Sequence, residues 1–183
     1  MSRIYLIRHG RTPANDEHRY CGSTDLPLSP AGIDELGTLR YENVSGSFVI
    51  SGMKRTLETL KFLFGNVSYS VDPGLREIDF GSFEMKTYEE LRNDPDYIRW
   101  LDGDNEKNTP PGGESGEAMT GRVLQAFDKY KHADEDFVII SHGGVIAAIM
   151  AYLFPCDGKD RYQWQPAPGH GYCIEEGRYR PVP

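Results

Sequence analysis

The chain has 183 residues, 38% hydrophobic and 26% charged, a balance typical of one globular domain. Its 28 acidic and 20 basic residues give a net charge of −8, which disfavours binding to nucleic acid or to an anionic membrane surface. No apolar run reaches the roughly 18 residues of a membrane span, and no signal-peptide pattern opens the sequence. Three scattered cysteines indicate neither a disulfide framework nor a zinc site. We therefore expect a soluble, cytoplasmic protein that forms a single domain over residues 1–183.

Short apolar runs alternate with helical patterns along the chain. Buried strands are expected at residues 4–7, 48–50 and 137–140, and each is followed by a helix signal. The first helix should begin after Ser29 at Pro30 and place Ile33, Leu36 and Leu39 on one face.

Further helices are expected at residues 53–64, from near Ser115 onward, and at 145–154. A hairpin should follow at residues 171–182, and the polar stretch within 87–115 should form a lid-like surface excursion. This alternation predicts an α/β fold: a three-layer sandwich with a mostly parallel central sheet flanked by helices.

Cationic and imidazole side chains follow the three predicted strands. Arg8 and His9 come after the first, Arg55 shortly after the second, and His142 after the third. Because ligands of open α/β sheets bind at the carboxyl ends of the strands, we expect these groups to converge there. Each motif alone is common in ordinary turns, but the three together favour a pocket for an anion.

The residue types at this edge suit phosphate in particular. Arginine offers a planar fork of donors that matches phosphate oxygens, and Gly143 with Gly144 would open a helix whose free amides favour negative charge. A neutral imidazole can attack phosphorus, whereas a protonated one can only donate, so two histidines could divide these tasks.

The motifs that carry this chemistry resemble those of the histidine phosphatase superfamily, which has the phosphoglycerate mutase-like fold. The resemblance rests on "LIRHGRT" from Leu6 and "VIISHGGVI" from Val138, which enclose "YCGSTDLPLSPAG", "SGMKRTLET", "LREIDFGSFEM" and "PPGGES". It extends over nearly the whole chain.

The resemblance implies roles for individual residues. His9 would be the nucleophile, and Arg8, Arg55 and a cationic His142 would hold the phosphoryl oxygens. Asn15 and the Gly143 amide would add further donors. Glu77 would donate and later accept the proton, with Asp79 and Glu84 as competing carboxyl groups. No metal or other cofactor is expected.

Four positions depart from the family pattern: Arg11, Gly52, Phe83 and Met85. Arg11 stands where glutamate or glutamine is usual, and Gly52 replaces a proline. Phe83, Glu84 and Met85 replace the commoner Trp-Glu-Gly. Separately, Tyr97 and Trp100 could either line a lid or belong to the core.

The favoured function is that of a histidine acid-type phosphatase, which hydrolyses a small phosphorylated metabolite through a phosphohistidine intermediate. The short chain is most similar to small phosphatases that act on α-ribazole 5′-phosphate in cobalamin biosynthesis. A phosphoglycerate mutase is the first alternative, although the longer mutases have inserted segments that are missing here. A non-catalytic phosphate-binding protein is the second. The sequence fixes neither the natural substrate nor the oligomeric state.

Overall fold

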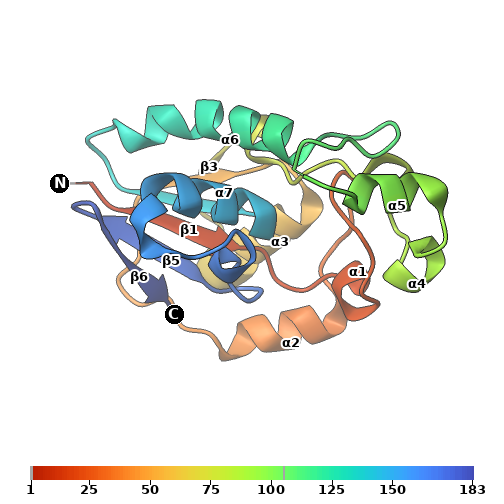
Figure 1. Ribbon diagram of the computed structural model, residues 1–183. Coiled ribbons are helices and arrows are strands. Elements are labelled where there is room, and N and C mark those ends of the chain that lie inside the picture. The colour runs from red at the N-terminus through yellow and green to blue at the C-terminus, as the bar shows by residue number, and fades with distance from the viewer. Residues whose placement is uncertain (1, 105) are drawn as a thin grey trace.

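The computed structural model describes residues 2–104 and 106–183, and a central six-stranded sheet organises them (Figure 1). The strand order is β3-β2-β4-β1-β5-β6. Pairing is parallel from β3 to β1 and antiparallel through β5 and β6, so the prediction of a mostly parallel sheet is confirmed. The strands are β1 Ile4–Arg8, β2 Ser47–Ile50, β3 Tyr69–Val71, β4 Phe137–Ser141, β5 Gly171–Glu175 and β6 Arg178–Val182.

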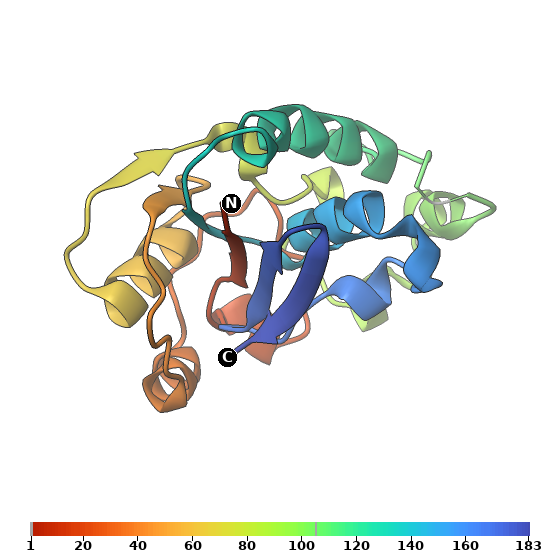
Figure 2. The ribbon, with the colours of Figure 1, turned by 90° about the vertical axis from the view of Figure 1, so that its left-hand side faces the viewer.

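Helices cover both faces of the sheet, as Figure 2 shows. The α-helices are α1 Pro13–Asp16, α2 Pro30–Thr38, α3 Lys54–Phe64, α4 Tyr88–Leu91, α5 Pro95–Leu101, α6 Gly116–Lys131 and α7 Gly143–Leu153. Short 3-10 helices occupy η1 Pro73–Leu75, η2 Gly81–Phe83, η3 Pro155–Asp157 and η4 Tyr162–Trp164. Alternate residues of β1 serve the two faces: Ile4 and Leu6 pack in the core beneath α6 and α7, whereas Tyr5 and Ile7 pack in the core on the side of α3. The predicted three layers are confirmed.

Local signals in the sequence set most helix ends. The Ser29 hydroxyl caps α2 by accepting from the Gly32 amide at 3.1 Å, and Gly65 ends α3. One expectation for α2 was wrong: Ile33 is 41% exposed, because α2 lies at the margin of the molecule against α3 and buries little besides Leu36. Strand β3 was also missed. All its residues are exposed at the sheet edge, so it lacks the apolar run that marks a buried strand.

The 87–115 segment lies beyond the carboxyl ends of the parallel strands, where Figure 1 places α4 and α5 beside α1. It contains α4 and α5 rather than a bare loop. Tyr97 is buried there in an aromatic cluster with Phe83, against which Trp100 packs half-buried. The core interpretation of these rings is therefore confirmed, and the lid interpretation stays a prediction. Within the described residues, no helix is long and apolar enough to cross a membrane.

Candidate active site

The parallel strands bring the predicted residues to one edge of the sheet. Arg8 pairs with Ser141 across β1 and β4, and the His9 amide donates to the Ser141 carbonyl at 3.0 Å. His9 and His142 follow directly, with ring centroids 5.1 Å apart. Arg55 joins them from the first turn of α3. Residues separated by more than 130 positions thus meet because parallel strands end together.

His9 is buried and its ring is held in one tautomer. Its Nδ1 lies 2.7 Å from the Gly10 carbonyl, which can only accept, so Nδ1 carries the proton and Nε2 carries the lone pair. Burial, followed by the positive charge of Arg55, holds the pKa of His9 well below its usual 6.5. The ring is therefore neutral at physiological pH, with a nucleophilic nitrogen at Nε2.

The hydrogen bonds of His142 in this geometry are those of a neutral ring, and its positive charge beside a bound phosphate stays a prediction. Arg55 donates from Nε to His142 Nδ1 at 3.2 Å, so this nitrogen accepts and the proton lies on Nε2, which donates to Ser51 Oγ at 2.8 Å. Burial is the largest cause that lowers the pKa of His142 well below 6.5, and Arg55 is the next. The sequence predicted both residues at this edge of the sheet but not the hydrogen bond between them.

Arg55 is anchored by a loop that sequence reasoning did not single out. Its Nη1 donates to the Thr24 carbonyl at 2.9 Å and its Nη2 to the Gly22 carbonyl at 2.8 Å. The Glu84 carboxylate holds this loop by accepting from the amides of residues 22, 23, 24 and 80 and from the Thr24 hydroxyl. Glu84 therefore positions Arg55, and its oxygens are occupied.

Arg8 carries a buried donor directed to the start of α7. Its Nη1 donates to the Pro166 carbonyl at 2.8 Å, whereas its Nε is buried without a hydrogen-bond partner in the part of the chain that the structure describes. A Cβ added at Gly143 would lie 3.2 Å from this nitrogen. Unpaired buried donors are uncommon, so Arg8 Nε is suited to an acceptor brought by a ligand.

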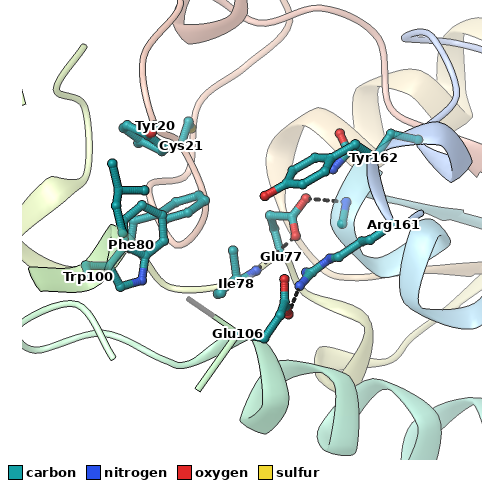
Figure 3. Close-up of a pocket in the computed structure, with 13 residues that line it drawn as sticks. Tyr20, Cys21, Glu77, Ile78, Phe80, Trp100, Glu106, Arg161 and Tyr162 are labelled. Atoms are coloured by element: carbon teal, nitrogen blue, oxygen red, sulfur yellow. Dashed lines mark hydrogen bonds and ion pairs between the residues drawn. The ribbon is translucent and has the colours of Figure 1, made fainter. Parts of the chain in front are cut away.

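Glu77 lies against the first turn of α7 (Figure 3). Its Oε2 accepts from the Gly144 amide and its Oε1 from the Ile78 amide, both at 3.0 Å. A Cβ at Gly144 would lie 2.5 Å from Oε1, so a side chain there would force the Glu77 carboxylate to shift. The structure thus brings Glu77 to the same helix end that Gly143 opens beside Arg8.

The remaining predicted residues lie at the margins of the site. Asn15 belongs to a capping box in α1, in which its Oδ1 accepts from the Thr12 amide at 3.0 Å. Asp79 accepts from Ser23 Oγ and from the Gly81 amide and is partly engaged in the loop. Arg11 forms ion pairs with Asp16 at 2.6 Å and with Glu35 at 2.8 Å, so surface carboxylates account for it.

Comparison with known proteins identifies the family. The family model described as histidine phosphatase superfamily (branch 1) matches residues 4–182. The chain belongs to this superfamily. Over 161 residues it is 29% identical to the adenosylcobalamin/alpha-ribazole phosphatase of Escherichia coli. The matched region covers 82% of this chain and 78% of that relative.

Two solved structures extend the comparison to the fold. The alpha-ribazole phosphatase of Shigella flexneri matches with a TM-score of 0.83 and 27% identity, over 98% of this chain and 95% of that one. A Thermus thermophilus structure named phosphoglycerate mutase matches with a TM-score of 0.75 and 31% identity, over 99% and 96% of the two chains. The protein is therefore a phosphatase-family enzyme with the phosphoglycerate mutase-like fold, as the sequence predicted.

Two of the departures from the superfamily pattern, Gly52 and Met85, lie at residues with positive φ. Gly52 has φ of +86°, which proline cannot adopt, and Met85 has φ of +62° in the left-handed region. The usual glycine at the latter position would adopt this conformation without strain. Phe83 is fully buried, so it fills an aromatic core position.

Among the described residues, no three His, Cys, Asp or Glu side chains gather in a way that could hold a metal ion.

Proposed function

We propose that this histidine phosphatase hydrolyses a small phosphorylated metabolite in two steps through a phosphohistidine on His9. The observation that carries the proposal is the His9 tautomer: the Gly10 carbonyl fixes the proton on Nδ1 and leaves the Nε2 lone pair available. A neutral, buried imidazole between Arg8 and Arg55 is suited to attack a phosphorus atom whose oxygens those arginines hold.

In the first step, His9 Nε2 forms a bond to phosphorus as the bond to the ester oxygen breaks. Glu77 gives its proton to the departing alkoxide. Arg8 and Arg55 stabilise the charge on the transferring group, with the Gly143 amide and Asn15 as additional donors. A bound phosphate dianion favours a protonated His142.

In the second step, water attacks the phosphohistidine. Glu77 takes a proton from the water, the phosphorus–nitrogen bond breaks, and inorganic phosphate leaves while His9 returns to its neutral state. One carboxyl group thus serves both steps. Its two backbone donors, from Gly144 and Ile78, keep it beside the start of α7 throughout.

We propose α-ribazole 5′-phosphate as the substrate to test first, because the relatives from Escherichia coli and Shigella flexneri are both named alpha-ribazole phosphatases. All three cysteines are free thiols, in keeping with a reducing cytoplasm.

The alternative activity is that of a mutase. It is favoured by the Thermus thermophilus structure, which is named phosphoglycerate mutase and has nearly the same length as this chain. Chain length therefore does not separate the two activities.

A single set of assays tests the proposal. The purified protein should release phosphate from p-nitrophenyl phosphate and from α-ribazole 5′-phosphate, and a His9→Ala variant should be inactive on both. Interconversion of 2- and 3-phosphoglycerate that is faster than phosphate release would favour the mutase instead. Turnover that persists in the His9→Ala variant would contradict the proposed nucleophile.

A further inference from the structure

A cavity of about 330 Å³ adjoins the candidate active site at Glu77 and Gly144 (Figure 3). Such a volume lies in the range of small-ligand sites. Its lining comes from the loop after α1, the loop around Glu77, the segment that contains α5 and the loop around η4, together with Gly116 of α6 and Gly144 of α7. These parts close the cavity around the one carboxyl group to which we assign proton transfer.

One wall of the cavity consists of three aromatic rings. The Tyr20 ring centroid lies 5.1 Å from that of Phe80 and 5.9 Å from that of Trp100. The Tyr20 hydroxyl is 2.6 Å from the hydroxyl of buried Tyr97, which fixes the ring in place. This wall is therefore a preformed surface of ring faces and edges.

Tyr162 stands across the cavity from that wall, just above Glu77 in Figure 3. Its side chain is 68% exposed, and within the described ranges no aromatic ring packs against it and no hydrogen bond engages its hydroxyl. A large apolar ring left in water gains free energy when a second ring covers it. A flat ligand group that entered here would contact aromatic surface on both of its faces.

The end of the cavity at Arg161 and Glu106 carries no net charge, because these two side chains neutralise each other. Arg161 forms an ion pair with Glu106 there, and a side chain at Gly116 would overlap both partners. A second anionic group on a ligand would meet the carboxylates of Glu106 and Glu77 as well as the paired Arg161. The charges thus disfavour a second phosphate or carboxylate and favour an uncharged group.

We propose that this cavity receives the alcohol portion of the phosphate ester and selects alcohols that carry a flat, uncharged aromatic ring, with Tyr162 as a specificity-determining residue. The inference rests on the proposed function: because Glu77 protonates the departing oxygen, the group attached to this oxygen must extend past Glu77 into the cavity. Ring stacking between Tyr162 and the opposite wall then adds binding that a saturated group of equal size lacks.

Benzyl phosphate and cyclohexylmethyl phosphate form a matched test pair, because they share carbon number and ester type and differ in the flatness of the ring. We expect kcat/KM to favour the benzyl ester by about two- to tenfold, the range for one aromatic pair. Tyr162→Leu should bring this ratio close to one, and Tyr162→Phe should keep it. Tyr152→Leu serves as the control, because Tyr152 is another exposed tyrosine, on α7 and outside the cavity lining.

The outcomes separate the two proposals. Equal turnover of the two esters by the unchanged protein, or a ratio that Tyr162→Leu does not alter, would overturn this inference and leave the phosphatase activity standing. A protein that hydrolyses neither ester nor p-nitrophenyl phosphate would overturn the proposed function, and this inference with it.

Discussion

Replacement of Glu77 by glutamine should separate the proton donor from the competing carboxyl group, Glu84. The carboxylate of Glu77 accepts from two backbone amides at 3.0 Å, one on each oxygen. An amide side chain has one accepting oxygen, so Glu77→Gln keeps the size of the group but loses one of these hydrogen bonds and the transferable proton.

The two losses have different magnitudes. A lost hydrogen bond costs about 1 kcal/mol, which lowers Tm by roughly 2–4 °C in a chain of this size. Loss of general acid catalysis lowers the rate by roughly 10²–10⁴ for an ester whose alkoxide must be protonated. Nitrophenolate leaves without a proton, and kcat/KM reports the steps up to the release of this leaving group. The kcat/KM for p-nitrophenyl phosphate should therefore fall by less than tenfold.

The assay compares kcat/KM for benzyl phosphate and p-nitrophenyl phosphate in Glu77→Gln and in the matched Glu84→Gln variant. Glu84 accepts several hydrogen bonds from the loop that holds Arg55, so Glu84→Gln should lower Tm and slow both esters equally. If Glu77→Gln kept its activity on benzyl phosphate while Glu84→Gln lost that activity selectively, the assignment of the proton donor would be refuted.

Three further predictions concern the surroundings of the site. Gly144→Ala should lower kcat/KM for benzyl phosphate by about 100-fold, because its Cβ would lie 2.5 Å from Glu77 Oε1. Gly121→Ala is the control and should keep the rate, because its Cβ has open space in α6. Equal rates in the two variants would be inconsistent with this reasoning. Met85→Gly should stabilise the fold by about 1 kcal/mol in thermal unfolding, because Met85 has φ of +62°, and a lower Tm would argue against strain there. The unfolded chain protonates its histidines near pH 6.5, whereas the folded chain holds the pKa values of His9 and His142 well below 6.5, so the free energy of unfolding should fall as the pH drops below 6.5. Urea unfolding at pH 7.5 and 5.5 should show a smaller loss in His142→Asn than in the exposed-site control His132→Asn, and equal losses would count against the buried neutral pair.

Sequence reasoning located the site because its main residues follow strand ends. The apolar runs of β1 and β4 mark buried strands, and parallel strands that end together bring His9 and His142 into contact without further information. The helix caps at Ser29 and Gly65 are local signals of the same kind.

What the sequence did not reveal depends on contacts between distant segments. The protonation of His142 is set by Arg55, whose position depends in turn on a loop held by Glu84. Arg11 was unexplained until Asp16 and Glu35 were found beside it. Tyr162 follows no motif or periodic pattern, and its place opposite Trp100 arises only from the folded chain.

The most direct test of the account is to locate the phosphate on the enzyme during turnover. The protein should be denatured in alkaline detergent while it hydrolyses p-nitrophenyl phosphate, then digested and examined by mass spectrometry. The account predicts a phosphorylated peptide with the modification on His9, absent from the His9→Ala variant. Phosphate on another residue, or undiminished turnover by His9→Ala, would contradict it.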